Sequence, residues 1–274
     1  MTCKTVQVGI SVYKQKYSYV RECLESVLNQ SHKDTLIDIR LDGPDSCERR
    51  TLEWLRKIES TNKKLTIHVG TKRLGIYRSY NSIFNLRKTP YLCQIDADDY
   101  INKYSLEILV AELEGLKNCG FAFTKCIEIT AEGKPMYMRH DSFNAQDMLT
   151  KFFCFHLRLI KRNYFDAIGG YFEEYKLAAD YDLCLKLNEI AGMACVDLPL
   201  YYHRNDPQSA SSVNQQSLIL ESLLVVNKAI ERRGLMEKFK AIPGKEEGEI
   251  ILIDVNSNLA NNPFYIIPQE RHQD

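Results

Sequence analysis

The sequence lacks the features of a membrane protein and of a secreted, disulfide-bonded one. No apolar run approaches the ~18 residues of a transmembrane helix, so we expect none. The first residues, MTCKTVQVGISVY, do not combine a basic leader with a long apolar core, so we expect no signal peptide. The nine cysteines are odd in number and include no C-x-x-C pair, which argues against a disulfide framework and a zinc site. The simplest compartment is therefore the cytoplasm, with peripheral contact to a membrane or a complex left open.

The chain also lacks an excess of charge of either sign. Lysine plus arginine and aspartate plus glutamate number 36 each, so the net charge does not favour a nucleic-acid surface, and we expect no nucleic-acid partner. There is no internal repeat and no low-complexity segment. Hydrophobic residues make up 45% of the 274 residues, enough for one large domain or one domain with an appendage.

The most informative stretch is a short apolar run that ends in acids, YLCQIDADD at 91–99. It predicts a buried strand with Asp96, Asp98 and Asp99 at its carboxyl end, where ligands bind in open α/β sheets. Carboxylates this close repel each other, and a divalent cation that also binds phosphates would relieve the repulsion. A solvated acidic turn is the alternative. A calcium loop fits poorly because its sixth position is Ile101 rather than glycine.

Apolar segments with strand and helix periodicity alternate before this stretch. The order β-α-β-α-β-α-β predicts an α/β fold with a parallel sheet and helices on both faces. The expected strands are 6–12, 36–41 and 65–69, and the expected helices are one capped by Ser18, one around Trp54 and one over 76–86.

The second half of the chain has a less regular pattern. We expect helices over 104–117, 145–155, 177–190 and 217–233, and strands over 121–129, 135–139, 157–161, 199–203 and 249–255. Residues 204–212 form a polar loop, Pro243 begins a linker-like run, and the end, rich in Asn and Gln, is expected to be poorly ordered.

Polar side chains at the strand ends make a set that suits a nucleoside diphosphate. The base can lie against Tyr13, and Asp42 can accept the N–H of a uracil-like edge. Arg73 can bind a phosphate, and a cation held by Asp98 can bridge the diphosphate. Each residue has an ordinary alternative, as a strand-end aromatic, a turn former or a solvated charge, and their shared position favours the binding site.

On these motifs the chain resembles the inverting glycosyltransferases of family 2, which have the GT-A fold. The matching pieces are GISVY at 9–13, LDGPD at 41–45, RLGIYRSYN at 73–81, DADD at 96–99 and ADYD at 179–182, and the resemblance covers about residues 4–212.

The resemblance implies a Rossmann-like, mostly parallel central sheet flanked by helices, with a C-terminal helical extension. It implies a nucleotide-sugar donor, Mn²⁺ or Mg²⁺, and a saccharide acceptor, with hexosyl or N-acetylhexosaminyl transfer. UDP is favoured because Asp42 suits uracil, with dTDP and GDP left open. Residues 1–100 would be the nucleotide-sugar-binding half, 101–212 the acceptor-binding and catalytic half, and 213–274 the C-terminal helix and tail.

The resemblance also implies roles for single residues. The nucleoside contacts would be Ser11, Tyr13 and Asp42, the ribose or base contact Asp96, the principal metal ligand Asp98, and a helper near the donor sugar or metal Asp99. His203 is a candidate for a further metal ligand, with an ordinary loop histidine as the alternative. We expect Arg204 to close on the diphosphate and 209–212 to form part of a lid.

Asp180 is the expected catalytic base. An inverting transfer needs a group that takes the acceptor proton as the hydroxyl oxygen attacks the anomeric carbon, and a carboxylate at a helix N-terminus stays ionised. A plain N-cap is the alternative. The chain departs from the family pattern at Ser11, where proline is usual, and at Ala179, where glutamate usually precedes the base.

Two other functions stay open. The missing glutamate leaves room for a non-catalytic nucleotide-sugar-binding subunit of a polysaccharide-assembly complex. A nucleotidyltransferase on a related fold is disfavoured because the loop 14–18 contains no glycine.

Overall fold

The computed structural model describes residues 4–139, 145–207, 214–245 and 249–256. Its main feature is one nine-stranded sheet. The strands are β1 (Val6–Val12), β2 (Thr35–Leu41), β3 (Leu65–Val69), β4 (Tyr91–Asp96), β5 (Tyr100–Ile101), β6 (Cys119–Ile129), β7 (Pro135–Arg139), β8 (Arg158–Lys161) and β9 (Gly192–Arg204). Their order is β3-β2-β1-β4-β8-β6-β9-β5, with β7 paired to β6.

The parallel sheet expected from the first half of the chain is confirmed for four strands. β1 pairs in parallel with β2 and β4, and β2 with β3. β8 then pairs antiparallel with β4, so the whole sheet is mixed. The parallel half therefore brings the carboxyl ends of β1, β2 and β4 to one edge, where the candidate residues lie.

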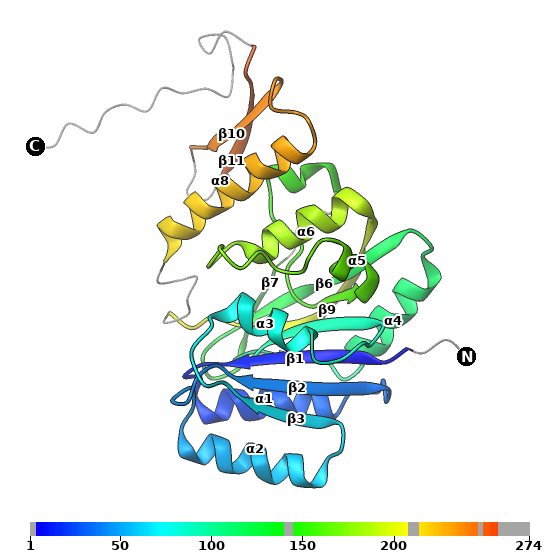
Figure 1. Ribbon diagram of the computed structural model, residues 1–274, viewed down its shortest axis with the longest axis vertical. Helices are drawn as coiled ribbons and strands as arrows, with labels where there is room; N and C mark the ends of the chain where they lie inside the picture. Colours follow the sequence, from blue (N-terminus) through cyan, green and yellow to red (C-terminus); the bar gives the residue numbers. More distant parts are fainter. Residues whose placement is uncertain (1–3, 140–144, 208–213, 246–248, 257–274) are drawn as a thin grey trace, which may run out of the picture.

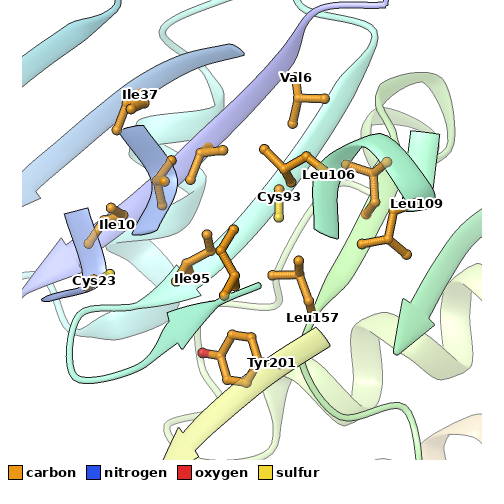
Figure 2. Close-up of a cluster of buried hydrophobic side chains, with 14 of the residues drawn as sticks. Val6, Ile10, Cys23, Ile37, Cys93, Ile95, Leu106, Leu109, Leu157 and Tyr201 are labelled. Atoms are coloured by element: carbon orange, nitrogen blue, oxygen red, sulfur yellow. The ribbon is translucent and has the colours of Figure 1, made fainter. Parts of the chain in front are cut away.

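Helices cover both faces of the sheet. They are α1 (Tyr17–Leu28), α2 (Arg49–Thr61), α3 (Ile76–Phe84), α4 (Ser105–Gly115), α5 (Arg162–Ala167), α6 (Ala179–Ile190) and α8 (Gln215–Arg232), with a 3-10 turn at Ala145–Leu149. One core cluster packs α1, α2 and α4 against the sheet, and the other packs α3, α5, α6 and α8. Figure 2 shows Val6, Ile10 and Ile95 of the parallel strands in the first cluster, beside Leu106 and Leu109 of α4.

The strand faces alternate between the two clusters. In β4, Cys93 and Ile95 belong to the first cluster and Leu92 to the second, as the two-residue period requires. Gly9 of β1 faces the second cluster, where an added Cβ would lie 3.0 Å from atoms of both Ile83 and Phe84. Glycine at this position therefore lets α3 lie close to the sheet.

Three local expectations were wrong. Ser18 does not cap α1, because the helix begins one residue earlier, at Tyr17, with Lys16 as its N-cap. The helix expected over 145–155 is only the 3-10 turn at Ala145–Leu149, since the following residues pass from the second core cluster to the first before entering β8. Tertiary packing has overridden local propensity there. β9 starts at Gly192, well before Pro199, where a register irregularity accommodates the missing N–H.

The C-terminal extension is a helix and a hairpin. α8 is followed by Gly234 in the left-handed region (φ +66°) and by the strands β10 (Phe239–Pro243) and β11 (Ile250–Asp254). Figure 1 shows the extension at the end of the molecule farthest from α2, with α8 beside α6. Two expectations, the lid at 209–212 and the poorly ordered end, fall largely on residues outside the described ranges.

None of the helices in the described parts of the chain is both long enough and apolar enough to cross a membrane.

Candidate active site

One cleft of about 1500 Å³ brings together every candidate residue from the sequence. These residues are Ser11, Tyr13, Asp42, Arg73, Asp96, Asp98, Asp99, Asp180, His203 and Arg204. The parallel half of the sheet supplies the first seven, α6 supplies Asp180, and β9 supplies the last two. Their convergence makes the cleft the candidate active site, while the role of each residue stays a prediction.

Asp96 ends β4 in a dense set of hydrogen bonds. Its Oδ1 accepts from the Tyr80 hydroxyl and the Gln94 amide, both at 3.0 Å, and the His156 Nε2 lies 3.3 Å from its Oδ2. Burial alone would raise the pKa of Asp96, but these three partners hold it well below its usual range. Asp96 is therefore a fixed anion at the floor of the cleft, level with Ser11 in the β1–β4 register.

At Asp98 and Asp99, burial and like charge outweigh the stabilising partners. Burial, followed by the charge of Asp96, raises the pKa of Asp98 to about 6. Burial and the charge of Asp98 raise the pKa of Asp99 well above its usual range, although Asp99 accepts from the Tyr201 hydroxyl at 2.6 Å and the Arg204 N–H at 2.7 Å. Two neighbouring carboxyls that resist ionisation indicate a site that gains from a bound cation.

Asp98 and Asp99 also differ in how far they are exposed to solvent. Asp99 is 2% exposed and ties the loop to β9, whereas Asp98 is only half-buried.

The donor set suits a cation that shares its coordination with a ligand. Within the described ranges, no three His, Cys, Asp or Glu side chains group closely enough to hold a metal ion by themselves. Mg²⁺ in phosphate-binding enzymes is held by one or two carboxylates plus substrate phosphates and waters, and Asp98 can supply such a carboxylate. The residues therefore fit a divalent cation that binds together with a diphosphate.

His203 lies in the cleft with its ring held by a second carboxylate. Its Nδ1 is 2.9 Å from Glu128, which Arg139 also contacts at 2.6 Å. Burial alone would lower the pKa of His203, but the bond with Glu128 and the charge of Asp99 raise it to about 9. A carboxylate on one ring nitrogen is the usual support of a histidine metal ligand, and His203 would have to lose its proton to act as one.

At the nucleoside end, Asp42 organises the loop that follows β3. It is 1% exposed, and its two carboxylate oxygens accept the backbone N–H groups of Leu74 at 2.8 Å and Gly75 at 2.9 Å. The adjacent Arg73 places its guanidinium 3.9 Å from the centre of the Tyr13 ring. Asp42 thus fixes the loop after β3 through its backbone. Arg73 of this loop covers Tyr13, the residue on which the nucleobase is expected to stack.

Arg204 was expected to bind the diphosphate, but in the structure its guanidinium contacts other residues of the protein. Its side chain is 1% exposed. The guanidinium donates to the backbone oxygens of Asp98 at 2.7 Å and Ala131 at 2.8 Å, and to the carboxylate of Glu22, and it lies over the Tyr19 ring at 4.3 Å. Arg204 therefore fixes the acidic loop at 96–99 from the interior of the protein.

Asp180 reaches the cleft from α6, so it lies on a different wall from the donor candidates at the strand ends. The N-cap of α6 is Ala178, so Asp180 is the second helical residue and the N-cap alternative is wrong. Its Oδ2 is 3.3 Å from two nitrogens of Arg158, and its Oδ1 accepts from the Tyr77 hydroxyl at 3.3 Å. The Asp180 side chain is 21% exposed, so the carboxylate is oriented by these partners and still faces the cleft.

Arg158 and His156 are site residues that the sequence reasoning missed. Arg158 is 1% exposed and also lies 3.1 Å from the Nε2 of His156, whose ring contacts Asp96. A chain of contacts through His156 and Arg158 thus joins Asp96 to Asp180. The only sequence signal was a charged residue inside the apolar strand 157–161, and it did not identify the partners.

Comparison with known proteins gives one family. The model of Glycosyl transferase family 2 matches residues 7–169. The hyaluronan synthase of Pasteurella multocida is 24% identical over 232 residues, which are 82% of this chain and 23% of that protein. The chondroitin synthase of Escherichia coli is 25% identical over 240 residues, which are 85% of this chain and 34% of that protein. The chain thus spans about a quarter to a third of the length of these relatives.

Solved structures share the fold. TarS 1–349 of S. aureus, in a crystal structure with UDP-GlcNAc, superposes with a TM-score of 0.66 at 16% identity, covering 82% of this chain and 66% of that one. A crystal structure of the same protein with UDP gives a TM-score of 0.61 at 16% identity, covering 84% and 71%. This likeness confirms the expected GT-A architecture.

Proposed function

Because the chain belongs to glycosyl transferase family 2 and is a glycosyltransferase, we propose that it moves a sugar from a UDP-sugar to an acceptor hydroxyl with inversion at the anomeric carbon. The observation that carries the proposal is the pairing of two unlike acidic sites across one cleft. Asp98 and Asp99 resist ionisation and gain from a cation, whereas Asp180 is held beside the Arg158 guanidinium. The expected donor site and the expected catalytic base therefore lie on different walls of the cleft.

The donor would bind along the ends of the parallel strands. Tyr13 and Arg73 already stack on each other, and a uracil ring can take its place against that pair. Ser11, Asp42 and Asp96 would contact the nucleoside from the ends of β1, β2 and β4. The neighbour TarS is described in complex with UDP and with UDP-GlcNAc, which supports a UDP-linked sugar as the donor class.

The cation, Mn²⁺ or Mg²⁺, would be held by Asp98, with His203 as a second candidate ligand. When bound, it would neutralise charge on the departing diphosphate. Asp99, with both oxygens in hydrogen bonds, and Arg204 would keep Asp98 in position from behind. We propose this supporting role for Arg204 because its guanidinium is buried and already bonds to Asp98, Ala131 and Glu22.

Asp180 would take the acceptor proton. The acceptor oxygen forms a bond to the anomeric carbon, the bond from that carbon to the diphosphate oxygen breaks, and the proton passes to the Asp180 carboxylate. Arg158 contacts one oxygen of the carboxylate and Tyr77 the other, so both orient it. The acceptor would be a saccharide, in keeping with relatives named as hyaluronan and chondroitin synthases.

This assignment also gives the proposed division of labour along the chain. Residues 1–100 would bind the nucleotide sugar, 101–212 would bind the acceptor and carry the base, and α8 with the tail would complete the domain. We propose the cytoplasm as the compartment from the cysteine usage of the sequence.

The test is a panel of UDP-sugars with saccharide acceptors, in Mn²⁺ or Mg²⁺, read by release of UDP and by the anomeric configuration of the product. An active pair should give product with inverted configuration, and EDTA should stop turnover. A product that retains the donor configuration would contradict the mechanism. Turnover unaffected by EDTA would contradict the role of the cation.

A further inference from the structure

The segment before the proposed base is held by a residue from the C-terminal extension. Glu221 of α8 accepts the N–H of Lys176 at 2.9 and 3.1 Å, of Leu177 at 2.6 Å and of Ala178 at 2.6 Å. Ala178 is the N-cap of α6, and Asp180 follows two residues later. A carboxylate 45 positions from Lys176 in the sequence thus binds three consecutive backbone N–H groups directly before the first residue of α6.

A carboxylate is the group that these donors require. Successive backbone N–H groups that converge on one point favour an anion, and the N-terminus of α6, which follows directly, also favours negative charge. Glu221 offers two oxygens with about four acceptor positions and meets three converging N–H groups. Glutamine would offer one oxygen, and its amide N–H groups would oppose the backbone donors.

The same segment is fixed from the opposite side by the residue that contacts the base. The Tyr77 hydroxyl donates to the Leu177 carbonyl at 2.9 Å and lies 3.3 Å from Asp180. Leu177 is therefore held through its N–H by Glu221 and through its carbonyl by Tyr77. Any shift of this segment changes the distance from Tyr77 to the Asp180 carboxylate.

α8 is also fastened to the far end of the same helix. Arg232 lies 2.8 Å from Glu189 in the last turn of α6 and 3.3 Å from the buried Asp182, and Arg233 lies 3.2 Å from Glu189. Figure 1 shows α8 alongside α6. α8, which carries Glu221, is thus attached to both the first and the last turn of α6. Leu218 and Ser222, the neighbours of Glu221 on α8, line the cleft.

From these contacts we propose that Glu221 is a positioning residue for the transfer reaction. Its carboxylate sets the geometry of residues 176–178 and so the orientation of Asp180 toward the acceptor. This inference rests on the proposed function, in which Asp180 is the base. It makes the C-terminal helix part of the catalytic unit, although the helix lies outside the family match at residues 7–169.

The experiment compares Glu221→Gln with Glu231→Gln. Glu231 is on the same helix and makes only an exposed pair with Lys228 at 2.8 Å, so its variant should behave as wild type. Glu221→Gln should lower kcat by about 10²-fold, the cost of a misplacement of roughly 1 Å. UDP affinity and the KM for the donor should stay within about twofold, because the donor contacts lie on the other wall.

Two further measurements separate positioning from folding. Amide hydrogen exchange at residues 176–178 should accelerate in Glu221→Gln and stay unchanged in Glu231→Gln. Adding Glu221→Gln to Asp180→Asn should cost no further turnover, because the group being positioned is gone. If Glu221→Gln does not fold, Glu221→Asp, which keeps the charge on a shorter side chain, is tested in the same way, with a smaller loss of kcat expected.

The outcomes distinguish this inference from the proposed function. Unchanged kcat in a folded Glu221 variant, or a full additional loss in the Asp180→Asn background, would overturn the positioning role while leaving Asp180 as the base. Wild-type turnover in Asp180→Asn alone would remove the base itself, and the positioning of that base with it.

Discussion

The replacement Asp180→Asn tests the proposed mechanism most directly. Asparagine keeps the size of the side chain and one carbonyl, which can accept from Arg158 or from Tyr77, but it cannot take a proton. The donor contacts lie at the ends of β1, β2 and β4, on the other wall. We therefore expect turnover to fall by about 10²–10⁴-fold, the usual contribution of a general base, and UDP affinity to change by less than about twofold.

The structure adds a cost in stability that a simple helix-cap residue would not have. Arg158 is 1% exposed, and Asp180 is the carboxylate that meets it directly. Removing one partner of a fully buried ion pair costs about 3–5 kcal/mol. Asp180 is 21% exposed and the asparagine oxygen still accepts, so we expect about 1–3 kcal/mol. For a chain of this size, the melting temperature should fall by roughly 2–12 °C.

The assay combines a melting curve, a UDP titration and steady-state rates, all measured well below the melting temperature. A second variant, Asp180→Asn with Arg158→Met, removes the guanidinium that the first change leaves without its carboxylate. We expect it to regain stability and no turnover. Turnover that returns with stability would show that the first loss was a folding defect, and near wild-type turnover in Asp180→Asn would refute the base.

Three further predictions concern the donor wall. In Asp98→Ala, UDP binding should no longer depend on Mn²⁺ and should be as weak as in the wild type with EDTA. Calorimetry that gives the same UDP affinity for the wild type with Mn²⁺, the wild type with EDTA and the variant would contradict the metal assignment. Asp42→Ala should weaken the affinity for UDP by about ten- to hundredfold, the value of one charge-assisted hydrogen bond, and should weaken the affinity for pyrophosphate less. Equal losses for both ligands would show that Asp42 only holds the backbone of Leu74 and Gly75. Because the pKa of Asp98 is raised from 3.8 to about 6, the folded state binds the extra proton, and the contribution of Asp98 to stability falls as pH rises from about 4 to about 6. Mn²⁺ with UDP competes with that proton and should raise the melting temperature more at pH 7 than at pH 5, so equal increases would count against the assignment.

The sequence predicted the parts of this molecule that have a local signature. The bounds of β1 and β3 were predicted to the residue, since β1 is a compact, mostly apolar run and β3 alternates apolar and polar residues. The candidate site residues also converged on one cleft, because the carboxyl ends of parallel strands must share an edge. The motif at the start of α6 placed Asp180 in that cleft as well.

The partners of those residues could not be predicted. Arg158 meets Asp180 across 22 positions, and Glu221 meets Leu177 across 44. Such pairings depend on how helices pack, and nothing in the local pattern specifies them. Arg204 shows the same limit, because the sequence assigned its charge to a ligand whereas the fold uses it inside the protein.

The contacts of Arg204 have a consequence for the order in which the chain matures during synthesis. The carboxylates at 96–99 leave the ribosome long before the residue that holds them, because 105 positions separate Asp99 from Arg204. At about 5–20 residues per second, that interval is roughly 5–20 s. The strands of the nucleotide half can pair during this time, but the acidic loop has neither β9 nor the guanidinium behind it. The acidic loop is thus translated early but is among the last parts of the molecule to reach its final form, and a nascent chain stalled before β9 should not retain UDP.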